Sequence, residues 1–390
     1  MKRISTARRA LPAPAKSAPT KPKAEGQSSV LPYGRSWLNR LADWVESLPG
    51  PAWWPYVLLG LILLTAQIAI QWAGGTYPVG TVDMFNVVVA VTVPYQLGLM
   101  HYLLRTGGHS LEDFRPALRA SPAEADELTY RLTTLPPRGA FLAGLGVTVF
   151  SLLIVLLSGL VGTLDLPWLT NILGDNILLA FPKVFRISAS PASMGLTGVI
   201  TLASWWTTGA YAYLVIHQLR LIDRIYTRFA YLRLFRLGPL YAFSRHTLRS
   251  AIGLLILAYA LFATAPQVVY SAVGGASWLL LVSGGVATFL LPLVGIHRHL
   301  VREKDRMLEE AGRRMEAGVA ELHRRMDKNE LARMDDLNKA LSSLEIERAA
   351  LERVPTWPWE RGTLRSLVAA ILIPLLIFVI QAILQRYLAG

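Results

Sequence analysis

Histidines and glutamines at the ends of apolar stretches are the residues of this sequence that could do chemistry. His101, His217 and His297 each lie near one end of such a stretch, where an imidazole could bind a metal ion or move a proton. Their spacing selects neither role, and the ordinary explanation is an amphipathic ring that reaches toward water. Gln381 and Gln385 lie one helical turn apart in the last stretch. They could line a water-filled path or form hydrogen bonds between helices.

Enzymatic chemistry is not indicated by the remaining residues. The chain has no Cys, and Asp83, Asp165 and Asp175 are isolated in sequence, so no paired acids or His-Asp arrangement suggests a lipid-modifying enzyme. No Asp, Glu, Lys or Arg falls inside an apolar stretch, which argues against a proton-coupled pump. We therefore expect no enzyme activity, no catalytic residues, no cofactor and no bound metal.

Seven apolar stretches must position these side chains. The chain is 53% hydrophobic, and a helix needs about 20 apolar residues to cross about 30 Å of hydrocarbon. The pattern predicts an all-α protein with seven transmembrane helices, with Gly274-Gly275 separating the fifth from the sixth. The predicted spans run approximately over residues 54–72, 85–104, 140–164, 194–219, 251–270, 277–297 and 366–384.

The orientation follows from the basic residues. Of 39 Lys and Arg, 36 fall on one side of the predicted spans, and only Lys183, Arg186 and Arg386 fall on the other. Basic residues favour the cytoplasm, so the N-terminus is predicted inside and the C-terminus outside, in a bacterial plasma (inner) membrane. The net charge of +13 is explained by anionic lipid headgroups as partners, and no nucleic acid partner is expected.

The chain divides into five predicted parts. Residues 1–29 are a disordered basic cytoplasmic tail, because they are rich in Ala, Pro, Ser and basic residues. Residues 36–48 are an interfacial amphipathic helix, and residues 54–297 form a six-span domain with cytoplasmic helical extensions. Residues 298–365 form a cytoplasmic helical hairpin, and residues 366–390 hold the seventh span. The apolar face of the interfacial helix is expected to contain Trp37, Leu41, Trp44, Val45 and Leu48. The external segment 164–185 is broken by Pro and Gly, which suits a lid or re-entrant piece.

Three cytoplasmic segments are expected to be helical. Ser121 with Glu124 forms a capping-box pattern for a short helix that ends near Thr134. Arg220, Arg224 and Arg228 recur every four residues, so the fourth span should continue as a helix toward residues 238–239, with the arginines in water.

The third segment, residues 298–365, carries heptad patterns. The two patterns do not share one register across residues 327–330, which predicts a coiled-coil-like antiparallel hairpin as a helical base. Its apolar positions are Val301, Leu308, Met315 and Leu322, then Met334, Leu337, Leu341, Leu344 and Leu351.

The last span has the most individual character. Trp357 and Trp359 precede it and are expected to anchor its start at the cytoplasmic interface. Pro374 should kink the helix. Gln381 and Gln385 would then either face a shared axis between subunits or pair with polar groups of the same chain, such as Gln67 or Gln71.

Four segments resemble those of an uncharacterised family of bacterial multi-pass membrane proteins. They are Gly238 to Ser244 (GPLYAFS), Ile296 to Leu300 (IHRHL), Leu337 to Leu344 (LNKALSSL) and Pro355 to Trp359 (PTWPW). The resemblance covers most of the chain after the tail and implies no known activity.

The topology is also similar to that of insect odorant and gustatory receptors. These are seven-span channels with an internal N-terminus, a cytoplasmic helical base and a last span that lines the pore. The gustatory pattern of Thr-Tyr, five hydrophobic residues and Gln-Phe meets residues 376–380 and Gln381 here, whereas Pro374-Leu375 and Ala382 depart from it.

Together these features predict a non-enzymatic membrane-anchored sensor or scaffold that acts through its cytoplasmic helical base. The alternative is a homo-oligomeric ion channel with a pore lined by the last transmembrane helix.

Overall fold

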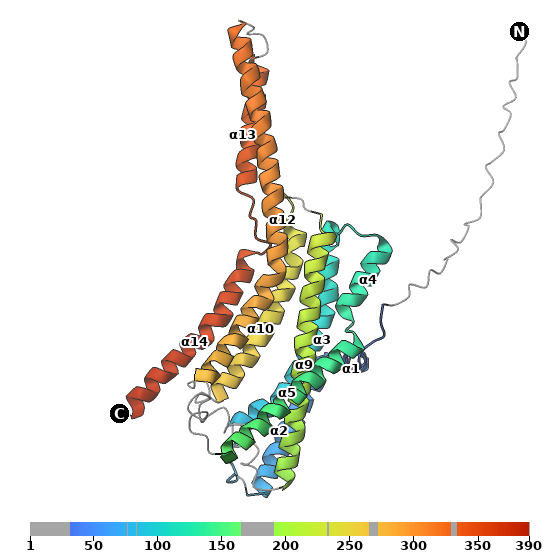
Figure 1. The fold of residues 1–390 in the computed structure, drawn as a ribbon, viewed down its shortest axis with the longest axis vertical. Coiled ribbons are helices and arrows are strands. Elements are labelled where there is room, and N and C mark those ends of the chain that lie inside the picture. Colours follow the sequence, from blue (N-terminus) through green and yellow to red (C-terminus); the bar gives the residue numbers. More distant parts are fainter. Residues whose placement is uncertain are drawn as a thin grey trace, which may run out of the picture. The chain divides into compact units, whose positions relative to one another are not determined.

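The computed structural model describes residues 32–75, 77–82, 84–164, 191–231, 234–264, 272–328 and 334–389, so the tail 1–29 and most of the segment 164–185 lie outside it. Within these ranges every regular element is a helix (Figure 1). The long helices are α1 Trp37–Ser47, α2 Trp54–Ala73, α3 Met84–Phe114, α4 Pro122–Thr133, α5 Pro137–Leu164, α9 Pro191–Arg228, α10 Tyr241–Thr264, α12 Ala272–Asp327, α13 Met334–Glu352 and α14 Arg361–Ala389.

Five of the described helices are long and apolar enough to cross a membrane, namely α2, α3, α5, α9 and α12. Their length and composition fit a multi-pass membrane protein. The two other predicted spans overlap α10 and α14. The apolar part of α14 is the shorter stretch Gly362–Ile377, and α10 is described from Tyr241 to Thr264, with residues 265–271 outside the described part of the chain.

The helices pack in sequence-neighbour pairs and across the chain. Helix α3 contacts α2, α9 and α10, while α9 also contacts α5 and α12. Helices α5 and α9 approach closely because Gly209 has no side chain: a Cβ there would lie 2.3 Å from the carbonyl oxygen of Ala143. Small residues of this kind let helix backbones meet in a membrane, where no hydrophobic effect drives helix association.

A buried aromatic core joins the ends of α3, α9 and α10. It consists of Phe114, Tyr226 and Phe243, whose ring centroids lie 5.1 to 5.6 Å apart. The Tyr226 hydroxyl donates a hydrogen bond to the Leu240 carbonyl oxygen at 2.7 Å, so its polar atom is satisfied. These three residues lie beyond the predicted spans, and they belong to a hydrophobic core that continues into the spans through residues such as Phe289 and Leu293.

The buried face of α1 is rotated from the predicted one but overlaps it, since Val45 is buried and Trp37 and Leu41 pack against the core. Leu38, Ala42 and Val45 are buried, whereas Trp44 is exposed. The reason is a tether at Asn39: its amide donates to the Thr133 carbonyl oxygen and accepts from the Leu135 backbone N–H, both at 2.9 Å. These bonds rotate α1 so that the Leu38 side faces the protein.

The short helix predicted from Ser121 is confirmed as α4, with both hydrogen bonds of the capping box present between Ser121 and Glu124. The extension of the fourth span is shorter than predicted, since α9 ends at Arg228. There the backbone pairs instead with an earlier segment, through an isolated antiparallel bridge between Leu118 and Ala230. The three arginines of α9 are exposed, as the stripe predicted.

Helix α12 combines two predicted parts in one element. It begins at Ala272, so Gly274 and Gly275 lie inside its first turns and do not form the break between spans. It then continues without interruption past the boundary expected at residue 298 and ends at Asp327. Helix α13 runs back beside it (Figure 1). The two are antiparallel, because Gly318 faces Leu341 and Lys304 reaches Glu352.

The last helix, α14, packs mainly on α10. The Tyr259 hydroxyl of α10 donates a hydrogen bond to the Ile371 carbonyl oxygen at 2.9 Å. The helix continues through Pro374, whose ring nitrogen carries no hydrogen, so the carbonyl oxygen that loses its helical donor is that of Ala370, next to the one that Tyr259 bonds. Several aliphatic side chains of α14 are exposed, including Leu372, Ile373 and Leu376.

Candidate functional site

A hydrogen-bonded chain of three side chains joins α1, α2 and α3. The Nδ1 atom of His101 lies 3.0 Å from the Tyr56 hydroxyl, and its Nε2 atom lies 3.2 Å from a carboxylate oxygen of Glu46. His101 and Tyr56 are buried, whereas the Glu46 side chain is half exposed. The chain therefore runs from a carboxylate in contact with solvent to a phenol inside the bundle.

The geometry assigns the donors in this chain. A carboxylate can only accept, so Nε2 of His101 carries the proton that is donated to Glu46. When the ring carries only this one proton, Nδ1 accepts from the Tyr56 hydroxyl. The arrangement orients the imidazole and ties the interfacial helix to α3. It could also carry a proton between Glu46 and Tyr56.

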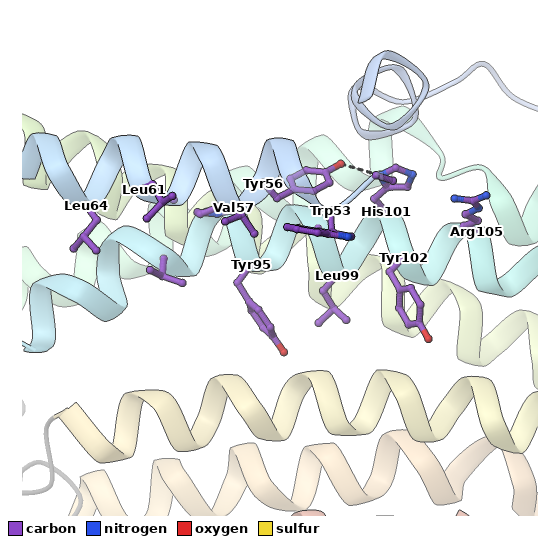
Figure 2. A pocket seen from close by; sticks show the side chains of 15 residues that line it. Trp53, Tyr56, Val57, Leu61, Leu64, Tyr95, Leu99, His101, Tyr102 and Arg105 are labelled. Atoms are coloured by element: carbon purple, nitrogen blue, oxygen red, sulfur yellow. Dashed lines mark hydrogen bonds between the residues drawn. The ribbon is translucent and has the colours of Figure 1, made fainter. Parts of the chain in front are cut away.

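A groove begins beside this chain and follows α2 and α3. Its volume is about 700 Å³, and its lining is apolar over most of its length. Figure 2 shows Leu64 and Leu61 toward one end of the lining and Arg105 at the other. Tyr95 points away from α2, and its hydroxyl donates to the Gly253 carbonyl oxygen of α10 at 2.9 Å. One end of the groove is thus purely aliphatic, whereas the other is aromatic and cationic.

A second polar cluster is buried between α3, α4, α9 and α10. The Gln218 amide donates to the carbonyl oxygens of Leu103 and Leu132, and its oxygen lies 3.1 Å from Nε2 of His246. Burial, aided by the positive charge of Arg249, lowers the pKa of His246 to about 4. The imidazole is therefore neutral at pH 7 and donates through Nε2, which makes this cluster a structural link between four helices, α3, α4, α9 and α10.

The three histidines singled out in the sequence are not brought together. His101 bonds Tyr56 and Glu46, His217 lies 3.0 Å from the Arg131 carbonyl oxygen, and His297 lies 3.1 Å from that of Thr356. Across the described residues no group of three His, Cys, Asp or Glu side chains could hold a metal ion. Each ring has its own local partner.

The tryptophans before the last helix form a ring stack. His297 lies over Trp357 with ring centroids 3.9 Å apart and planes 8° apart, and Trp357 lies over Trp359 at 4.3 Å. Trp359 also contacts Phe289 of α12 at 5.6 Å. Both tryptophans therefore fasten the start of α14 to α12.

The predicted polar strip belongs to α14, but the side chains of Gln381 and Gln385 lie outside the described part of the structure. Gln67 and Gln71, their expected partners within the chain, are buried on α2. Helix α2 packs against α3 and α9, whereas α14 packs on α10.

Sequence patterns missed the partners of His101 and the whole of the second cluster. Glu46 was one acid of an amphipathic helix, and Tyr56 was one aromatic residue at the start of a span. Only the crossing of α1 and α2 over α3 brings both to His101. Gln218 and His246 carried a weaker signal, since each is a polar residue next to a long apolar stretch.

Comparison with family models, curated proteins and solved structures finds no match to this chain.

Proposed function

We propose that this protein is a non-enzymatic, membrane-anchored sensor or scaffold that acts through a cytoplasmic hairpin, formed by residues 298–327 of α12 together with α13. The proposal includes seven spans in a bacterial inner membrane, with the N-terminus and the hairpin in the cytoplasm. The observation that best supports this proposal is that α12 is one continuous helix, which runs from a candidate span to Asp327 at the end of the first hairpin helix.

The length of α12 supports this role. Its 56 residues extend over about 84 Å at 1.5 Å per residue, whereas the hydrocarbon core of a bilayer is about 30 Å thick. A large part of the helix must therefore lie outside the lipid. The helix stays continuous through Pro292, where one backbone hydrogen bond is missing, so a tilt of the membrane part or a bend at Pro292 would move the hairpin tip.

Hydrogen bonds and apolar packing hold the end of the hairpin where α13 ends. The Lys304 ammonium donates to the carbonyl oxygens of Glu352 and Val354, at 2.7 and 3.0 Å, and so caps the end of α13. Leu351 is fully buried in the core that contains Phe114. Further along, Leu308, Met315 and Leu322 are only half buried against α13.

The flank of the hairpin offers a surface for a partner. Val319 and Met326 lie one heptad apart on α12, in the row next to the seam with α13, and both are exposed. A two-helix hairpin covers only part of its apolar surface, and a third helix laid along this row would cover more. The proposed partner surface is therefore the Val319 row of α12.

Site-specific crosslinking in native membranes tests this surface. A photo-reactive residue at Val319 should give one discrete protein adduct, because it faces the partner. The matched control is Ala317, which is also exposed but lies about 200° away around the same helix. Equal adducts from both positions, or none from Val319, would contradict the scaffold proposal. Loss of the adduct in Met326→Asp, with unchanged thermal unfolding, would support it.

Topology reporters test the proposed orientation. A reporter placed in the turn at Asn329 should be active in the cytoplasm, and one fused after Gly390 should be active outside. Both on one side would mean an even number of spans between them, and the seven-span arrangement would be wrong.

A homo-oligomeric ion channel is the second candidate. The observation that favours it is the position of α14, which packs mainly on α10 and leaves aliphatic side chains exposed, where a second copy or lipid would cover them. A stable tetramer or pentamer in nanodiscs is the expected result for a channel, and a monomer would contradict it. In this cysteine-free chain, Gln381→Cys should then react rapidly with a membrane-impermeant thiol reagent and form disulfides between subunits.

A further inference from the structure

The groove along α2 and α3 has the dimensions of one lipid chain. Its lining on α3 extends from Val91 to Arg105, a length of about 21 Å at 1.5 Å per residue. One leaflet of a bilayer contributes about half of the 30 Å hydrocarbon core, or about 15 Å. The groove therefore covers the depth of one leaflet and continues into its headgroup region.

The apolar part of the groove suits an acyl chain. Gly60 and Gly98 have no side chains, and a Cβ at Gly60 would lie 3.4 Å from the Pro94 ring. Val57 and Leu61 beside them are exposed. The wall of the groove is thus aliphatic, with room between α2 and α3 and without a charged group.

The other end of the groove is cationic. Arg105 lines it, and the guanidinium of Arg249 lies 5.8 Å from the ring centre of Tyr102, another lining residue. Among the described residues neither arginine forms an ion pair with an acid. The nearest carboxylate of the site, Glu46, is bonded to His101, and no Asp or Glu lines the groove.

We propose that the groove binds an anionic glycerophospholipid of the leaflet on the Arg105 side. One acyl chain lies along Val57, Leu61 and Val91, and the phosphate pairs with Arg105. Trp53 and Tyr102 lie at the depth where aromatic rings meet headgroups. Charge complementarity selects this occupant over an apolar helix, because a helix would leave Arg105 without an anion. The inference does not depend on the role of the hairpin.

Fluorescence quenching by brominated lipids in nanodiscs tests the proposal on the full chain. The chain has no Cys, so a fluorophore attached at Leu61→Cys reports on the groove alone. The matched control is Leu145→Cys on α5, which is also exposed and apolar but does not line the groove. Bromine is placed on either phosphatidylglycerol or phosphatidylcholine in membranes of one fixed composition.

At Leu61 we expect brominated phosphatidylglycerol to be enriched about fivefold over its mole fraction, as about 1 kcal/mol for one cation near an anionic surface implies. At Leu145, quenching by brominated phosphatidylglycerol should follow the mole fraction of this lipid in the membrane. Arg105→Gln should abolish the enrichment, and Val57→Trp should reduce quenching at Leu61 by both lipids because it fills the groove.

Three outcomes would overturn the inference. Quenching at Leu61 that follows the mole fraction means that the groove meets only bulk lipid. If phosphatidylglycerol is still enriched at Leu61 in the Arg105→Gln variant, a cation other than Arg105 binds its headgroup. An absence of quenching by either lipid means that protein covers the groove, and a disulfide between two Leu61→Cys chains would identify that cover as a second copy.

Discussion

The aromatic core at the ends of α3, α9 and α10 and the seam of the hairpin are both built from apolar side chains outside the predicted spans, but they are buried to different degrees. Phe114, Phe243 and Tyr226 are almost completely inaccessible to solvent. Leu341 in the seam is only half buried, although it lies against Gly318 so closely that a Cβ there would be 2.7 Å from its Cδ2 atom.

The difference comes from the number of helices that meet. Three helix ends surround the aromatic core, so each ring is covered on all sides. Two helices meet in the seam, and each side chain keeps one flank in water. The aromatic core should therefore determine the stability of the whole protein, whereas the seam should determine only whether the hairpin forms.

Truncation in the aromatic core should have the largest effect. Phe243→Ala removes a fully buried ring and should lower the free energy of unfolding by about 3 to 5 kcal/mol. Thermal unfolding in detergent micelles measures this. Phe235→Ala is the matched control, because that ring is exposed and its loss should leave the midpoint nearly unchanged. Equal effects of the two substitutions would remove the distinction between core and surface.

The buried polar cluster beside this core should make stability depend on pH. Because the pKa of His246 is about 4 in the folded protein and about 6.5 when unfolded, only the unfolded chain binds a proton between these values. The free energy of unfolding should fall as the pH decreases from about 6.5 to about 4, by about 3 kcal/mol in total.

His246→Gln should flatten this dependence relative to the wild type, as measured by unfolding midpoints from pH 8 to pH 5. His109→Gln is the control at an exposed histidine of α3, and it should keep the wild-type slope. A wild-type slope in His246→Gln would show that another group carries the linkage.

A charge in the seam should act locally. Leu341→Asp places a carboxylate against Gly318 and forfeits about half of the roughly 1.5 to 3 kcal/mol that full burial of a leucine contributes, because Leu341 is only half buried. We expect faster hydrogen exchange throughout α13 with little change in α3 and α9. Ile346→Asp, on the outer face of the same helix, should change neither. Exchange that rises equally in all helices would mean that hairpin and bundle unfold as one unit.

The smallest effect is expected inside the predicted spans. The Gln96 amide of α3 donates to the Thr208 hydroxyl of α9 at 2.8 Å. Thr208→Val keeps the shape and removes this bond, which should cost about 0.6 kcal/mol. Thr201→Val is the control, because the Thr201 hydroxyl bonds only its own helix at Thr197. A double-mutant cycle with Gln96→Leu isolates the pair, and a coupling near zero would show that the bond does not stabilise the bundle.

Local patterns were sufficient for much of the fold. The capping residues Ser121 and Glu124 predicted α4, and the loss of heptad register predicted the break after Asp327. Both depend on residues a few positions apart. Where a distant contact intervened, the prediction was wrong in part: the bridge between Leu118 and Ala230 ends α9 early, and Asn39 rotates the buried face of α1 from the predicted one.

The candidate site shows the same difference between local sequence patterns and contacts of distant residues. The sequence by itself determined the apolar spans, the strong asymmetry of basic residues and the presence of a histidine at position 101, because composition and periodicity are local properties. The tertiary structure alone decided that His101 meets Tyr56 and Glu46, and that Arg105 lies at the end of a groove. Those contacts depend on how α1, α2 and α3 cross, and crossing is set by the packing of side chains from distant parts of the chain, such as Gly98 against Tyr56.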